Sequence, residues 1–231
     1  MKPDYNLSLP LNFLKQIKKH NDRSWFAEHK ATYDAAFGEL IVFADLVLTE
    51  LKKHDDIETP TGKKSLFRLY NDVRFSKDKS PYKINLGGAF RRATALRRGG
   101  YYFHIQPGNS FVAGGFWGPN AQDLGHIRQH VAADPKPLTG IIKSKPFKKV
   151  FGTLQGEQVK TAPRGYTADH PAIELLRYKQ FIVRHDFTDE EVLHASFHKK
   201  VVQAFQDMRP FLDYMSEILT TDLNGISLHN H

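Results

Sequence analysis

The chain has 231 residues, 40% of them hydrophobic and 12% aromatic, which is enough to build the core of one large domain or two small ones. It carries a formal net charge of +8 and contains no Cys, which excludes disulfides, thiolate metal sites and a cysteine nucleophile. No stretch approaches the roughly 18 uncharged residues of a membrane helix, and residues 1–10 lack the apolar region of a signal peptide. We therefore expect a soluble, cytoplasmic protein with no membrane partner.

The first part of the chain predicts helices. Leu11–His20 has the apolar spacing of a short helix, and Asp22 is a suitable N-cap for a second helix that runs to about Lys53. Gly38 is the position inside the second helix where a break is most expected. A polar loop follows at His54–Gly62.

The middle of the chain predicts antiparallel strands joined by short turns. Four segments have alternating or strand-like patterns: Leu66–Phe75, Ile84–Phe90, Tyr101–Gln106 and Ser110–Trp117. In the first of these, the alternation places Phe67, Leu69, Val73 and Phe75 on one face and Arg68, Tyr70, Asp72 and Arg74 on the other.

The second half predicts helices around one more strand. Asn120 is expected to cap a helix to about Val131, Asp134–Gly156 to form short helical pieces, Ala172–Tyr178 a short helix and Phe181–Phe187 a strand. Thr188 begins a capping box, which opens a helix that reaches Met208 and is kinked or restarted at Pro210. We predict a single α+β domain over residues 1–231, with an antiparallel sheet of about four to six strands packed by the N-terminal and C-terminal helices.

The positive charge is concentrated in one part of the chain. Residues 63–98 contain eleven Lys or Arg and two acids, Asp72 and Asp78, which is a net +9 where the whole chain carries +8. Such a block indicates either an anionic partner or an internal network of ion pairs.

The segment from Arg68 to Tyr82 closely resembles the signature of a bacterial family known as domain of unknown function 2461, R-x-x-R-D-x-R-F-x-x-x-K-x-x-Y. The matching positions are Arg68, Asp72, Arg74, Phe75, Lys79 and Tyr82, and Asn71 stands where the family usually has Arg. The stretches Gly114–Trp117, Ala162–Tyr166 and Asp169–Pro171 are also similar to that family. The resemblance extends over the whole chain and implies a single-domain protein, but it implies no catalytic residue.

The signature has two interpretations. In the first, Asp72 orients the guanidinium groups of Arg68 and Arg74 so that they bind a phosphate or carboxylate. Residues of the following turn, Lys79, Tyr82 and Lys83, would then complete a site for a small, phosphate-bearing anion. In the second, the same charges form an internal network that fixes the turn.

Two other functions stay open. Arg91, Arg92, Arg97 and Arg98 flank an expected hairpin tip that would bind a nucleic-acid backbone. Alternatively, the basic block contacts an acidic protein partner. The residues do not decide whether the protein is an enzyme; if it is, Asp72 and His104 are the candidate bases. No cofactor or metal site is predicted.

Further motifs each have a structural and a functional interpretation. Gly114–Asn120 is either a tight turn with Trp117 in the core or a helix start that binds an anion, with Trp117 stacked on a base or sugar. Asp169 is expected to cap the helix near Pro171. The pairs His126/His130 and His194/His198 have helical i, i+4 spacing, which suits metal ligands but arises readily by chance among twelve histidines.

Overall fold

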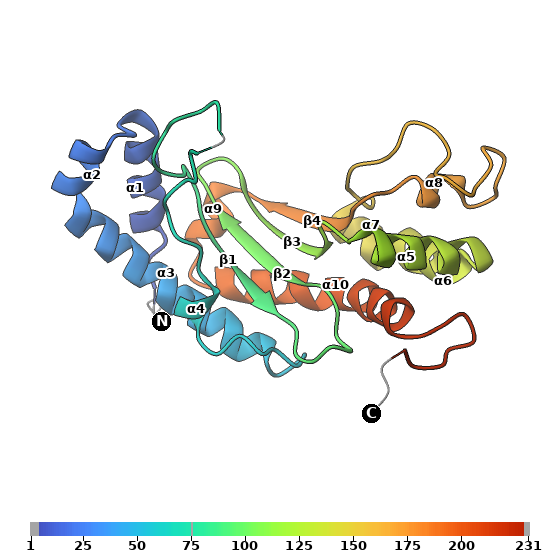
Figure 1. Ribbon diagram of the computed structural model, residues 1–231. Helices are drawn as coiled ribbons and strands as arrows, with labels where there is room; N and C mark the ends of the chain where they lie inside the picture. The colour runs from blue at the N-terminus through green and yellow to red at the C-terminus, as the bar shows by residue number, and fades with distance from the viewer. Residues whose placement is uncertain (1–4, 75, 229–231) are drawn as a thin grey trace. The chain divides into compact units, whose positions relative to one another are not determined.

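The computed structural model of the protein describes residues 5–74 and 76–228. Within these residues the helices are α1 (Ser8–Lys19), α2 (Arg23–Glu28), α3 (Lys30–Leu51), α4 (Gly62–Ser65), α5 (Ala121–Ala133), α6 (Lys136–Lys143), α7 (Lys145–Phe151), α8 (Ile173–Leu176), α9 (Asp189–Leu193) and α10 (Phe197–Thr220). The strands are β1 (Leu86–Arg91), β2 (Gly100–Ile105), β3 (Ser110–Phe116) and β4 (Phe181–Phe187). They form one antiparallel sheet in the order β1-β2-β3-β4 (Figure 1), which confirms the α+β prediction.

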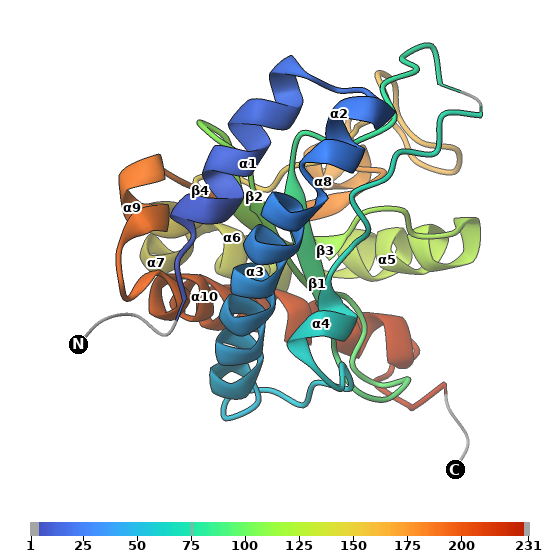
Figure 2. The same ribbon diagram turned by 90° about the vertical axis from the view of Figure 1, so that its left-hand side faces the viewer.

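By its internal contacts the chain divides into two compact units. The first comprises Met1–Phe90, Tyr102–Val112 and Asp186–Gln203, and in it α1 and α4 pack against α3 (Figure 2). Its core centres on Phe43 of α3, whose ring lies edge-on to Phe103 of β2 at 5.5 Å and stacks on Phe197 of α10 at 5.6 Å. These buried rings fasten the long N-terminal helix to the sheet within this unit.

The second unit comprises Arg91–Tyr101, Ala113–His185 and Ala204–His231. Phe205 of α10 lies 4.9 Å from the ring of Tyr101, and Met208 fills the space over Gly114 of β3. A Cβ atom added at Gly114 would lie only 2.7 Å from the Met208 sulfur. In this unit, therefore, the C-terminal helix packs closely on the sheet because a glycine removes the side chain between them.

Two helix predictions are wrong in their boundaries. The predicted second helix is divided at His29, where the ring Nδ1 lies 2.8 Å from the Trp25 carbonyl oxygen, and Gly38 lies inside α3. The helix after the Thr188 capping box ends at Leu193, and α10 then begins at Phe197 and continues through Pro210. Pro210 is exposed, so water can satisfy the carbonyl group that loses its partner.

In the described part of the predicted strand Leu66–Phe75, residues 66–74, no continuous strand forms. Only isolated antiparallel bridges occur there, Leu66 to Gly88 and Tyr70 to Tyr82. At the second bridge the ladder bonds are made by the flanking residues, from the Asn71 N–H to the Pro81 carbonyl at 2.9 Å and from the Lys83 N–H to the Leu69 carbonyl at 2.8 Å. The backbone groups of Tyr82 point to the other side, where Asn21 Oδ1 accepts from the Tyr82 N–H at 3.0 Å and Asn21 Nδ2 donates to the Tyr82 carbonyl at 2.8 Å. Phe75, which was predicted on the same face of this strand as Phe67, Leu69 and Val73, lies outside the described residues.

In the described part of the chain, no helix combines the length and the apolar character needed to cross a bilayer.

Candidate functional site

A polar cavity of about 330 Å³ lies beside the signature segment in the first unit. Its lining residues are Lys18, Asn21, Asn71, Asp78, Ser80, Tyr82, Lys83, Ile84 and Asn85. Two of the predicted site residues, Tyr82 and Lys83, therefore lie at this cavity. The other four, Arg68, Asp72, Arg74 and Lys79, do not line it.

Tyr82 forms a rigid part of the cavity wall. Its side chain is buried and stacks on Phe26 of α2, with ring centroids 4.4 Å apart, while Tyr70 lies 5.2 Å away. The two hydrogen bonds from Asn21 hold its backbone, and burial raises the pKa of its hydroxyl. The residue thus fixes the position of its neighbour Lys83 in the chain.

Lys83 places a cation at the cavity. Its Nζ donates a 2.9 Å hydrogen bond to the carbonyl oxygen of Arg68, which leaves part of its three-donor capacity for other acceptors. Partial burial, and then the nearby charge of Arg68, lower the pKa of the Lys83 ammonium group. The Arg68 side chain is exposed and makes no ion pair with any described residue.

The remaining signature residues bond to their own loop. Arg74 donates twice to Asp72, with Nε–Oδ1 and Nη2–Oδ2 distances of 2.9 and 2.7 Å, and this hydrogen-bonded Arg74 holds the pKa of Asp72 below its usual range. Lys79 donates to the Val73 carbonyl at 2.9 Å. Asn71 bridges the loop by donating from Nδ2 to the Ser80 carbonyl at 2.9 Å. These contacts shape the loop that borders the cavity, and no row of arginines on a strand is formed.

The charge around the cavity is positive. Lys18, in the last turn of α1, and Lys83 face a single lining carboxylate, Asp78. Asp78 accepts the Ser80 N–H at 2.8 Å, so one of its oxygens is already engaged. With Arg68 close to Lys83, the cavity offers cationic and amide donors in excess of acceptors.

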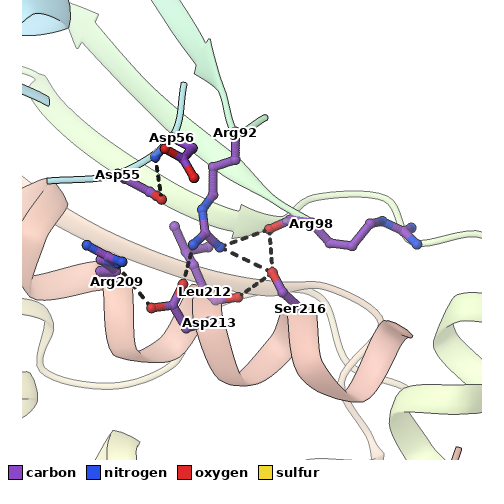
Figure 3. A network of polar contacts seen from close by, with 8 residues as sticks. All are labelled: Asp55, Asp56, Arg92, Arg98, Arg209, Leu212, Asp213 and Ser216. Carbon is purple, nitrogen blue, oxygen red and sulfur yellow. Dashed lines mark hydrogen bonds and ion pairs between the residues drawn. The ribbon is translucent and has the colours of Figure 1, made fainter. Parts of the chain in front are cut away.

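The arginines of the predicted basic hairpin have other partners in the second unit. Arg92 is buried, and its guanidinium group donates to the Asp213 carboxylate, to the Ser216 hydroxyl at 3.2 Å and to the Arg98 carbonyl (Figure 3). The side chain of Arg98 pairs with Asp123 at the start of α5. Arg92 is therefore a buried structural group in this unit, not a surface contact.

The candidate motifs of the sheet have local structural roles. His104 is buried and lies between the Tyr102 hydroxyl at 2.8 Å and Gln106 Oε1 at 2.9 Å, the environment of a hydrogen-bonded sheet histidine. Gly115 lies within β3, where an added Cβ would be 2.1 Å from the Phe181 carbonyl oxygen. Trp117 is 73% exposed, so the interpretation that buried it in the core is wrong.

Two further sequence interpretations are resolved by local contacts. Asp169 does not cap α8; instead His170 accepts the Ala172 N–H through its Nδ1 at 3.0 Å. His194 and His198 do not share one helix, because α9 ends before the first and α10 contains only the second. His126 and His130 both lie on α5, as their spacing predicted.

Seven lining residues were not among the predicted site residues: Lys18, Asn21, Asn71, Asp78, Ser80, Ile84 and Asn85. Asn71, Asp78 and Ser80 lie within the signature segment, and Ile84 and Asn85 come just after Lys83, so these five could have been found by including the neighbours of the predicted residues. Lys18 lies in α1 and Asn21 in the link between α1 and α2, and nothing in their local sequence pairs them with residues some sixty positions later.

The structure is thus that of an α+β protein with a pocket lined by lysine and asparagine side chains. The pocket lies beside the signature loop, whose polar side chains hydrogen-bond within the loop itself. The model of the family described as "Conserved hypothetical protein (DUF2461)" matches residues 10–214, and the chain belongs to this family. No curated protein and no solved structure shows significant similarity to the chain.

Proposed function

We propose that this protein binds a small, phosphate-bearing anion in the cavity next to Lys83. The observation that carries the proposal is the position of the Lys83 ammonium group at a polar cavity, anchored by the Arg68 carbonyl and partly desolvated. Because this cation is already held in position, it can form charge-assisted hydrogen bonds to a ligand at a smaller cost in conformational entropy.

The charges around Lys83 favour an anion over a neutral ligand. Burial and Arg68 both disfavour the charged form of Lys83, and a bound anion relieves the repulsion between these two cations. Arg68 is the signature residue with an exposed guanidinium group near Lys83, so we assign it the outer edge of the site. Phosphate suits this arrangement because its several oxygens can accept from an ammonium, a guanidinium and amide groups together.

A compact ligand is favoured over a nucleic-acid backbone. A volume of about 330 Å³ is of the order that encloses a small molecule. The four arginines of the alternative hypothesis do not form an exposed clamp, since Arg92 is buried and Arg98 pairs with Asp123. The proposal assigns binding and no chemical step.

Thermal unfolding tests the proposal. Inorganic phosphate, pyrophosphate and a nucleoside monophosphate are each added to the full chain, with chloride at equal ionic strength as the reference. A ligand at a hundred times its Kd stabilises by about 2.7 kcal/mol, which raises the Tm of a protein of this size by about 5–10 °C. Stabilisation by at least one of these compounds is expected.

Two charge-matched variants identify the site. Lys83→Gln should remove most of the Tm increase, whereas Lys77→Gln, at an exposed position of the same loop outside the lining, should retain it. The proposal fails if no phosphate compound stabilises the wild-type chain, or if both variants respond as the wild type does.

A further inference from the structure

Two histidine rings meet a backbone carbonyl in the second unit, away from the cavity. His126 and His130 lie one turn apart on α5, and their Nε2 atoms are 3.2 Å apart. The carbonyl oxygen of Thr221, the residue after α10, lies 2.8 Å from Nε2 of His126 and 3.2 Å from Nε2 of His130. Three potential ligand atoms thus form a small triangle.

Hydrogen bonding can satisfy the Thr221 carbonyl, which accepts from two donors, but it leaves the contact between the two rings unfavourable. A carbonyl oxygen only accepts, so His126 must donate its Nε2 proton to it, and that Nε2 can then no longer accept from His130. If His130 also donates to the carbonyl, the two Nε2–H groups face each other at 3.2 Å with nothing between them. A cation bound by all three lone pairs removes the conflict.

The triangle has nearly the dimensions of a metal site. Zn–N bonds of about 2.0–2.1 Å in tetrahedral geometry place neighbouring ligand atoms roughly 3.3 Å apart. The two contacts at 3.2 Å are close to this value, and the contact between His126 and Thr221 would open by about 0.5 Å. Both histidines are only half-buried, so an ion can reach them.

The surroundings are acidic although the chain as a whole is basic. The carboxylates of Asp222 and Glu217 interact electrostatically with His130. Asp222 is held in place because its Oδ1 accepts the N–H groups of Asn224 and Ile226, each at 2.8 Å. Two carboxylates beside the two imidazoles provide the negative charge that a divalent cation needs.

We propose that His126, His130 and the carbonyl oxygen of Thr221 bind a divalent transition-metal cation of the Zn²⁺ class, which ties α5 to the end of α10. In the described residues no set of three His, Cys, Asp or Glu side chains could hold a metal ion, so the backbone carbonyl is essential to this site. The competing account is that the two rings only cap the carbonyl at the end of α10.

Calorimetric titration of the chelator-treated full chain with Zn²⁺ tests the proposal. We expect a site of one Zn²⁺ per chain whose affinity falls at least tenfold in His126→Gln and in His130→Gln, since each loses one of three ligands. His194→Gln is the matched control, because His194 bonds to Ser196 near the end of α9 and should leave that affinity unchanged. Gln keeps an N–H donor for the Thr221 carbonyl, so a role in capping alone predicts no loss.

NMR of the histidine nitrogens provides a second measurement on the wild-type chain, in case a variant fails to fold. Zn²⁺ should remove the protons from Nε2 of both rings and shift these two nitrogens together. The proposal is overturned if Zn²⁺, Ni²⁺ and Co²⁺ up to about 1 mM leave both rings unchanged. It is also overturned if the Gln variants bind Zn²⁺ as tightly as the wild type.

Discussion

The ammonium group of Lys83 donates a 2.9 Å hydrogen bond to the carbonyl oxygen of Arg68, so the first residue of the signature is joined to the residue that follows its last. Between them, Asn71 bonds to Ser80 and Lys79 to Val73, which closes the segment on itself. The signature is therefore a closed loop whose two ends meet beside the cavity, and the basic side chain at that junction is held in a defined position.

The affinity for inorganic phosphate should fall as the pH rises through the lowered pKa of Lys83. Burial and Arg68 stabilise the neutral form, so the cation is lost at a lower pH than for an ordinary lysine. Titrations between about pH 8 and pH 10 measure this effect, because the phosphate charge stays constant there while a normal lysine remains protonated over most of the range. A phosphate affinity that does not change up to the highest pH of this range would contradict the assignment of Lys83 as the binding cation.

The same shift has a consequence for the stability of the unliganded chain. The folded-state pKa of Lys83 lies below the unfolded-state value, so between these two values the unfolded chain binds more protons. The contribution of Lys83 to the free energy of unfolding therefore rises with pH in that window, and Lys83→Gln should lack this rise.

Tyr82→Ala should lower the free energy of unfolding by about 3 kcal/mol, because it removes a buried ring and leaves a cavity beside it. Tyr82→Phe keeps the stacking on Phe26 and should change this energy by less than about 1 kcal/mol. Urea unfolding measures both. Similar losses in the two variants would show that the hydroxyl, not the ring, supports the cavity wall.

Gly115→Ala should destabilise the second unit by about 3 kcal/mol, through both a clash and backbone strain. Its φ of +123° is unfavourable for residues with a side chain, and the added Cβ would be 2.1 Å from the Phe181 carbonyl oxygen. Gly118→Ala is the control, since nothing lies within 4 Å of a Cβ at that position. Equal unfolding midpoints for the two variants would contradict the close approach of β3 and β4.

Arg92→Met should lower the free energy of unfolding by about 2 kcal/mol, because it removes several hydrogen bonds from a buried guanidinium group, one of them to Asp213. Arg74→Met is the matched control, because the Arg74 side chain is 76% exposed. The unfolding midpoint of this variant should stay close to that of the wild type. If the control loses as much stability as Arg92→Met, burial is not what distinguishes these arginines.

The features that follow from neighbouring residues were predictable from sequence. The capping box at Thr188, the Asn120 cap of α5 and the strand Phe181–Phe187 all depend on groups within a few positions of one another, and the structure confirms them. The basic motif likewise led to Tyr82 and Lys83, which lie at the cavity.

The features that depend on distant partners were not predictable. Asn21 hydrogen-bonds the backbone of Tyr82, 61 residues away, and so lines the cavity with it, although its local sequence indicates only the break between two helices. Arg92 is buried because it meets Asp213, 121 residues later in the chain. In both cases the local pattern was compatible with another outcome, and a contact from elsewhere in the fold decided between them.

Calorimetric titration with pyrophosphate at neutral pH is the most direct test of the anion site. For the wild-type chain we predict saturable binding at one site. The wild-type Kd should be at least tenfold lower than the Kd of Lys83→Gln, a difference of about 1.4 kcal/mol in binding free energy. The Kd of Lys77→Gln should lie within twofold of the wild-type Kd. Equal affinities in the wild type and Lys83→Gln, or no binding by the wild type, would contradict the proposal that this cavity holds a phosphate-bearing ligand.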